Sequence, residues 1–139
     1  MESVSHKDWM ALAVAEARRA AAEGEVPVGA IVVVENRVVG RGHNLTESRA
    51  DATLHAEMVA LRAASATLGR WRLQDAKLYV TLEPCPMCTG ALLLARVAEV
   101  YFGWWDPRMG AMGSLFDLAA HPDLPHQIRV YPETCADEC

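Results

Sequence analysis

The residues best suited to chemistry in this sequence are an imidazole and two thiols that come from two separate segments. His55 is followed two residues later by Glu57, and Cys85 and Cys88 lie further along in the segment 84–88. One imidazole and two thiolates suit zinc, and three protein ligands leave the fourth tetrahedral position open for water, as in a catalytic site. Glu57 is spaced so that it can face this water and move protons without binding the metal. The set predicts hydrolytic chemistry at a Zn²⁺ ion.

Each half of this set alone has a simpler interpretation. A C-x-x-C pair is also typical of a redox site or of half a zinc ribbon, and a single histidine is commonly a hydrogen-bonded core residue. Here the two halves occur together, with Glu57 in place and Pro84 directly before Cys85. This arrangement, H-x-E followed by P-C-x-x-C, resembles the signature of the zinc-dependent nucleobase deaminases.

Helices and strands must bring the two segments together, and hydrophobic periodicity with turn residues predicts an alternation of both. The expected helices span residues 5–22, 55–68, 86–96 and 114–120. The expected strands span residues 28–34, 37–42, 77–82, 99–102 and 127–131, with an irregular loop over 104–113. Inside the first strand, Gly29 indicates either a close approach to the backbone or a bulge. Strands that alternate with helices indicate a layered α/β domain.

The candidate ligands fall at the predicted helix starts. His55 lies at or near the first turn of its helix, from which it and Glu57 can point into one cavity. Cys85 and Cys88 lie at the N-terminus of the next helix, where the helix dipole lowers the pKa of a thiol. A bound metal lowers it further, so we expect both sulfurs to be thiolates.

Length and composition set further bounds on the protein. The 139 residues suit one domain, 1–139, with a core that needs no disulfide staples. No apolar run approaches the roughly 18 residues of a membrane span, and no signal peptide is visible, so we expect a cytoplasmic protein with reduced thiols. Thirteen basic residues against eighteen acidic ones give a net charge of −5. This charge argues against indiscriminate binding of polyanions but allows a local basic patch.

Four further segments resemble the bacterial tRNA adenosine deaminases. They are VPVGA at 26–30, GHN at 42–44, TLEPC at 81–85 and GAMGSL at 110–115. The resemblance runs from about Trp9 to Cys139. It implies a cytidine-deaminase-like three-layer fold around a five-stranded mixed sheet, and a homodimer. It also implies conversion of adenosine to inosine at the wobble position of a tRNA anticodon loop.

The same resemblance implies roles for individual residues. Zinc would be held by three side chains, those of His55, Cys85 and Cys88. Glu57 would shuttle protons. Asn44 falls where the family has an asparagine that contacts the flipped base, although without the family it is an ordinary turn residue. The backbone N–H of Ala56 is a second expected hydrogen-bond partner of the base.

Several departures from the family pattern concern the substrate and not the metal. Leu54 replaces a small residue, and Trp104 and Trp105 stand where a small and a polar residue are usual. With Arg108, these tryptophans lie in the loop best placed to hold neighbouring bases, or they are core or dimer contacts. A deaminase of a free nucleobase or nucleoside, of the guanine or cytosine type, stays open because the net charge is acidic. An inactive zinc-stabilised scaffold is a third possibility, against which Glu57 counts because a structural site has no use for a free carboxylate.

Overall fold

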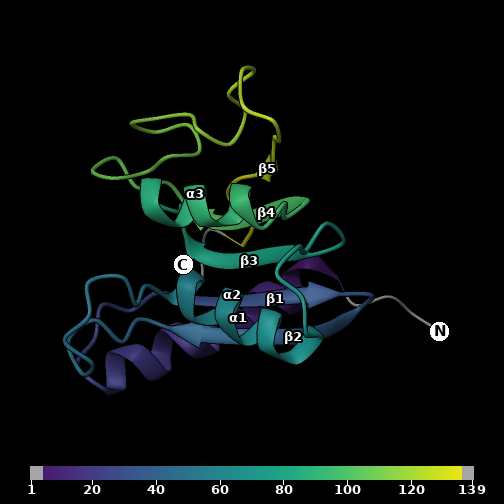
Figure 1. Ribbon diagram of the computed structural model, residues 1–139. Coiled ribbons are helices and arrows are strands. Elements are labelled where there is room, and N and C mark those ends of the chain that lie inside the picture. Colours follow the sequence, from purple (N-terminus) through teal and green to yellow (C-terminus); the bar gives the residue numbers. More distant parts are fainter. Residues whose placement is uncertain (1–4, 136–139) are drawn as a thin grey trace.

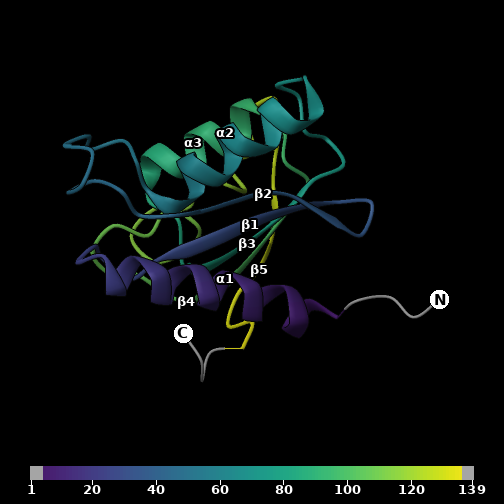
Figure 2. The same cartoon turned by 90° about the horizontal axis from the view of Figure 1, so that it is seen from below.

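The computed structural model describes residues 5–135 of the 139-residue chain. Three layers make up the fold: a sheet lies between α1 (His6–Ala22) on one face and α2 (Ala56–Leu68) and α3 (Pro86–Leu94) on the other (Figure 1, Figure 2). The sheet has the order β2-β1-β3-β4-β5, formed by β1 (Gly29–Val34), β2 (Arg37–His43), β3 (Lys77–Leu82), β4 (Glu99–Trp104) and β5 (Arg129–Tyr131). The expected α/β three-layer fold with five strands is confirmed. No helix within residues 5–135 has the length and apolar character needed to cross a membrane.

The sheet is mixed, as predicted. β1 pairs antiparallel with β2 and with β3, whereas β3 with β4 and β4 with β5 pair parallel. The β1–β2 hairpin turns at Glu35 and Asn36, whose φ values of 49° and 61° suit a type I′ turn. Parallel strands need a crossover, and α3 supplies it between β3 and β4. α3 ends at Leu94, earlier than the predicted Arg96, whose φ of 64° is left-handed.

The strand register gathers several chain segments at one edge of the sheet. Gly29, which begins β1, lies opposite His43, which ends β2. Leu82, which ends β3, lies opposite Trp104, which ends β4. The segments that follow β2, β3 and β4 therefore leave the sheet side by side.

α1 begins at a capping box formed by Ser5 and Asp8, which the run SHKD at 5–8 predicts. The N–H of Asp8 donates to Oγ of Ser5 (3.2 Å), and the N–H of Ser5 donates to the Asp8 carboxylate (3.3 Å). These bonds satisfy backbone donors that the helix itself leaves unpaired. The buried face of α1, with Trp9, Met10 and Ala13, packs on the sheet and closes the layer opposite α2 and α3.

Gly29 marks a close approach of two backbones, one of the two interpretations that the sequence left open. A Cβ at this position would lie 2.0 Å from the carbonyl oxygen of Ala13 in α1. Gly40 does the same on the opposite face, where a Cβ would lie 2.3 Å from the carbonyl oxygen of Ala60 in α2. The irregularity in the β1–β2 register lies further along β1. Both helices thus rest directly on the hairpin, which fixes α2 relative to β2.

The segment 114–120 is irregular, so the helix predicted there was wrong. The N–H groups of Leu115 and Phe116 both donate to the carbonyl of Gly110 (3.0 Å each), which folds the chain into a tight turn. The carboxylate of Glu83 takes further N–H groups of this region. The N–H groups of Leu115, Phe116 and Leu118 thus pair with the carbonyls of Gly110 and Ala111, and not with the carbonyls four residues before them as a helix requires.

Candidate metal centre and active site

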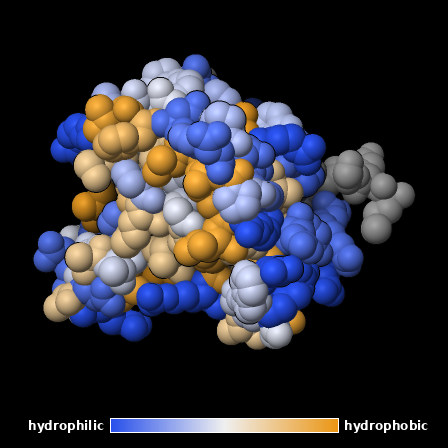
Figure 3. Space-filling model, turned by 45° about the horizontal axis from the view of Figure 1, so that its top comes forward, coloured by the Kyte–Doolittle hydropathy of each residue, from blue (hydrophilic) through white to orange (hydrophobic). Residues whose placement is uncertain are grey.

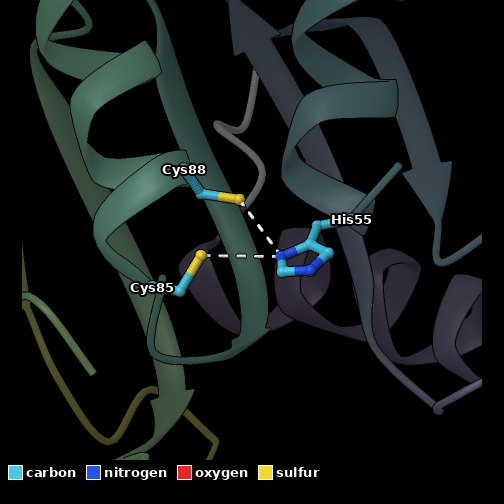
Figure 4. Close-up of side chains that lie close together, drawn as sticks. All are labelled: His55, Cys85 and Cys88. Atoms are coloured by element: carbon cyan, nitrogen blue, oxygen red, sulfur yellow. Dashed lines mark hydrogen bonds between the residues drawn. The ribbon is translucent and has the colours of Figure 1, made fainter. Parts of the chain in front are cut away.

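His55, Cys85 and Cys88 converge at the sheet edge described above (Figure 4). Nδ1 of His55 lies 3.5 Å from Sγ of Cys85 and 3.6 Å from Sγ of Cys88. A tetrahedral zinc ion with bonds of about 2.0 to 2.3 Å holds its nitrogen and sulfur ligands roughly 3.5 to 3.8 Å apart. The donor atoms therefore already have the spacing of a zinc ligand set.

Two helix starts place these side chains. His55 is the N-cap of α2, with φ −69° and ψ 156°, and Cys85 is the N-cap of α3. Neither side chain caps its own helix, which leaves both available to a metal. Pro86 at the first position of α3 suits a helix start because that position needs no N–H donor. Cys88 lies in the first turn of α3 and is fully buried.

Each of the two thiols shifts the pKa of the other. The pKa of Cys85 is lowered to about 5, mainly because Cys88 donates to its sulfur and also because His55 lies close by. The pKa of Cys88 is raised, first by its hydrogen bond to Cys85 and then by burial. Because zinc binds thiolates, binding must release the proton on Cys88 before both sulfurs can act as ligands.

Glu57 projects from the first turn of α2 into the same cavity and is only 4% exposed. Burial is the main reason that its pKa is raised to about 7, and the negative charge near Cys85 adds to the effect. A carboxyl group with such a pKa can both accept and return a proton near neutral pH.

The cavity beside the metal centre has a volume of about 270 Å³. Its walls come from five stretches of the chain, all near the edge where the strands end: 26–28, 44–46, 55–57, 82–85 and 106–109. Polar groups of Asn44, Glu57 and Arg108 share this lining with apolar side chains. A mostly apolar pocket with a few placed polar groups is typical of small-ligand sites.

Asn44 and Ala56 are bonded to each other. Oδ1 of Asn44 accepts a hydrogen bond from the N–H of Ala56 at 2.8 Å. The Ala56 N–H, expected to contact the base, is thus already engaged. Its contact orients the Asn44 amide, whose Nδ2 has no partner in the described part of the protein.

Trp104, Trp105 and Arg108, the candidate base-binding residues of the 104–113 loop, have different surroundings in the structure. Arg108 lines the cavity. Trp105 packs edge-on against Phe102, with ring centroids 5.0 Å apart, and its indole N–H donates to Glu133. Trp104 is 47% exposed at the end of β4 and does not line the cavity. Of the three, only Arg108 lines the cavity.

Two buried carboxylates that hold loops around the cavity were missed by sequence reasoning: Glu83, which also lines it, and Glu25. Glu25 accepts hydrogen bonds from the N–H groups of Ser48 (2.7 Å) and Glu47 (3.0 Å) in the loop after β2, and these bonds lower its pKa. Glu83 binds the loop 106–114 in a similar way. The sequence did contain a signal for both residues, because each is an acidic residue close to a proline. Glu83 lies at the end of an apolar strand, and Glu25 lies shortly before one.

Comparison with known proteins identifies the family. Residues 3–104 match the cytidine and deoxycytidylate deaminase zinc-binding region. The tRNA-specific adenosine deaminase of Bacillus subtilis is 44% identical over 131 residues, which cover 94% of this chain and 81% of that protein. The chloroplastic tRNA(adenine(34)) deaminase of Arabidopsis thaliana is 50% identical over 110 residues, 79% of this chain and 8% of that much longer protein.

Solved structures agree with this relationship. A structure studied for A-to-I editing by tRNA:A34 deaminases at the wobble position superposes with a TM-score of 0.90, at 42% identity over 94% of both chains. The guanine deaminase of Bacillus subtilis gives a TM-score of 0.71 at 35% identity, over 73% of this chain and 66% of that one. The chain therefore belongs to the cytidine and deoxycytidylate deaminase family, within the group of the tRNA-specific adenosine deaminases, and is a hydrolytic deaminase.

Proposed function

We propose that this protein binds Zn²⁺ through His55, Cys85 and Cys88 and converts adenosine to inosine at the wobble position of tRNA. The observation that carries the proposal is the buried Glu57, which shares one cavity with the three ligand side chains. The spacing of the imidazole nitrogen and the two sulfurs suits zinc, as derived above. The tRNA-specific deaminases among its relatives support the choice of substrate.

The protein's own groups account for proton transfer in this reaction. A zinc ion here would supply a nucleophile by lowering the pKa of a coordinated water from about 15.7 toward 7. Glu57 would accept one proton of the attacking water as its oxygen bonds to the amine-bearing ring carbon, and would deliver this proton to the adjacent ring nitrogen. It would then carry the second proton of the same water to the amine, and the C–N bond would break as ammonia leaves. One water is consumed and one ammonia released, so adenosine becomes inosine.

Binding of the base is proposed to depend on Asn44. Because Ala56 fixes Oδ1 of this side chain, the Nδ2 group is left to donate to an acceptor on the base. Arg108, which lines the same cavity, carries a positive charge suited to a neighbouring phosphate or to stacking on a neighbouring base. A local contact of this kind is compatible with the net charge of −5.

An anticodon loop suits a cavity of this size. A zinc deaminase cannot reach a ring carbon inside a stacked helix, so it needs a base that is flipped or already in a loop. Bases in a single-stranded loop are unstacked at low cost, and loops are where proteins usually read RNA. A tRNA substrate is compatible with the expected cytoplasmic location.

A free purine base is the second candidate substrate. The similarity to the guanine deaminase of Bacillus subtilis and the acidic net charge favour it. The small cavity would accept either a free base or a base flipped out of an RNA loop. Only a comparison of substrates separates the two functions.

The test compares initial rates on four substrates: an anticodon stem-loop with adenosine at the wobble position, guanine, cytosine and free adenosine. We expect inosine to form in the stem-loop, measured by mass spectrometry, and little ammonia to be released from the free compounds. A matched stem-loop with its only adenosine paired in the stem should stay unmodified, because that base is stacked. Faster turnover of a free base, with no inosine in the stem-loop, would replace the tRNA function by the small-molecule one.

We further propose a homodimer formed through the outer face of α2 and α3. Among the described residues, Leu94 (74% exposed) and Trp71 (62%) are the most exposed large apolar side chains, and both line one groove there. Figure 3 shows apolar surface gathered near the middle of the face that it draws. Such a contiguous apolar patch is typical of an interface, and a second copy of the chain can cover it symmetrically.

Light scattering tests the dimer. The unsubstituted protein should have twice the mass of the chain, and Leu94→Glu should reduce it to one chain mass because a buried, unpaired charge opposes association. Leu115→Glu is the control, since Leu115 is also exposed (54%) but belongs to a different segment. A single-chain mass for the unsubstituted protein at micromolar concentration would contradict the proposal.

A further inference from the structure

Glu83 is a buried carboxylate, 2% exposed, that follows β3 and takes no part in the chemistry described above. Its Oε1 accepts a hydrogen bond from the N–H of Asp106 (2.9 Å). Its Oε2 accepts from the N–H groups of Met112 (2.9 Å) and Ser114 (3.1 Å). The Ser114 hydroxyl also donates to Oε1. Within the described residues, all the hydrogen-bond donors to this carboxylate come from one loop.

The loop held by Glu83 spans residues 106–114, and its first part, 106–109, is a wall of the active-site cavity. It contains no regular helix or strand. Asp106 closes the turn at 106–110, since its carboxylate accepts the N–H groups of Arg108 (3.0 Å) and Met109 (3.4 Å) and its carbonyl accepts that of Gly110 (2.8 Å). The Glu83 carboxylate and the Pro84 carbonyl, which accepts from the N–H of Ala111 (2.9 Å), attach this turn to the end of β3. Buried backbone N–H groups need acceptors, and the Glu83 carboxylate supplies them here.

Gly110 and Glu83 fit closely together. A Cβ at Gly110 would lie 2.3 Å from Cδ of Glu83 and 2.5 Å from the carbonyl oxygen of Asp106. Because its carboxylate is bonded by several donors, Glu83 is not free to move aside. A substitution at either residue therefore disturbs the same contact from opposite sides.

We infer that Glu83 is a positioning residue that holds in place the 106–109 wall of the cavity, which His55 and Glu57 also line. The inference rests on the proposed function, since this wall would face the base to be deaminated. Glu83 also directly precedes the segment that carries Cys85, so a single side chain joins the loop to the start of α3. Such placement matters because a displacement of about 1 Å can cost about a hundredfold in rate.

Glu83→Gln tests the inference, because the amide keeps the size of the side chain but replaces one acceptor oxygen by an NH₂ group. We expect the zinc content to stay the same and KM for the anticodon stem-loop to rise about tenfold, with a smaller fall in kcat. Trypsin cleavage after the exposed Arg108 should become about tenfold faster, since losing charge-assisted hydrogen bonds favours local opening by at least that factor.

Two further variants approach the same contact differently. Ser114→Ala removes only the hydroxyl donor and should change KM and cleavage in the same direction but less. Gly110→Ala keeps Glu83 and pushes the loop away from it, and should reproduce the changes of Glu83→Gln. If Glu83→Gln does not fold, these two variants decide the question by the same two measurements.

Glu99→Gln is the matched control for a purely structural role. The Glu99 side chain is 13% exposed and is bonded to Arg129 (2.9 Å) and Tyr101 (2.9 Å), at the other end of β4 from the cavity. Its loss should lower the melting temperature without changing KM or the cleavage rate at Arg108. A change in KM and in the cleavage rate at Arg108 therefore distinguishes the role proposed for Glu83 from general destabilisation, which Glu99→Gln represents.

A KM and an Arg108 cleavage rate within about twofold of the unsubstituted protein, in both Glu83→Gln and Gly110→Ala, would overturn the inference. The trypsin measurement needs no substrate. If the unsubstituted protein leaves the stem-loop unmodified, the proposed function fails, whereas the cleavage rates still decide whether Glu83 holds the loop.

Discussion

Replacing Glu57 by glutamine will lower kcat by about a thousandfold while leaving one zinc per chain and an unchanged fold. The carboxyl group is buried, its pKa is raised to about 7, and it shares a cavity with the metal ligands. Glutamine has the same shape but cannot accept and return a proton. General acid–base groups typically contribute about 10² to 10⁴ in rate, and Glu57 carries both proton transfers in the proposed reaction.

Single-turnover rates on the anticodon stem-loop, together with elemental analysis for zinc, separate the possible roles of Glu57. Glu99→Gln again serves as the control, because it removes a partly buried carboxylate far from the cavity. Activity of Glu57→Gln within about tenfold of the unsubstituted protein would remove Glu57 from the mechanism. Loss of zinc from this variant would instead identify Glu57 as a ligand.

The residues of the metal centre could be predicted because their chemistry imposes local spacing. Glu57 follows His55 closely enough to reach the same cavity, and a C-x-x-C pair at a helix start presents both sulfurs together. The structure places His55 at the N-cap of α2 and Cys85 at the N-cap of α3. For α3, Pro84 and Pro86 are the residues that indicate a helix start at this point. Local signals of this kind can be recognised in the sequence because each depends on only a few neighbouring residues.

Most of the fold could be predicted for the same reason. The capping box of α1, the hairpin turn at Glu35 and Asn36, and the β-branched run of β1 each depend on neighbouring residues. Gly29 was recognised as unusual, but its sequence neighbours could not distinguish a bulge from a close approach. The distinction depends on Ala13 of α1, which reaches Gly29 only in the folded protein.

The features that sequence reasoning missed are contacts between distant segments. At 114–120, where a helix was expected, Glu83 from far back in the chain binds the N–H groups of Met112 and Ser114, and the following N–H groups turn back to the carbonyls of Gly110 and Ala111. The Ala56 N–H was expected to be available to a base, but Asn44 already accepts its hydrogen bond. In each case a side chain from another element captured a backbone donor, and no local pattern records that.

Replacing His55 or Cys88 by alanine will remove zinc and abolish activity. Each supplies one of only three protein ligands, and the separations of 3.5 and 3.6 Å from Nδ1 of His55 to the sulfurs leave no other residue to take its place among those described. The unfolding temperature should also fall, because the metal joins the N-termini of α2 and α3. A ligand present at a hundredfold excess over its dissociation constant stabilises the folded state by about 2.7 kcal/mol, and this contribution disappears with the ion.

Elemental analysis and thermal unfolding, with and without a chelator, provide the measurement. The chelator should lower the unfolding temperature of the unsubstituted protein and leave that of His55→Ala unchanged, since the variant has no zinc to lose. Met87→Leu is the matched control, because it changes a side chain of similar volume in the same turn of α3 without touching a ligand. One zinc per chain in His55→Ala would show that the imidazole is not a ligand. Since α2 would then contribute no bond to the metal, the ion could no longer fix Glu57 relative to α3, and the proposed mechanism would lose its geometry.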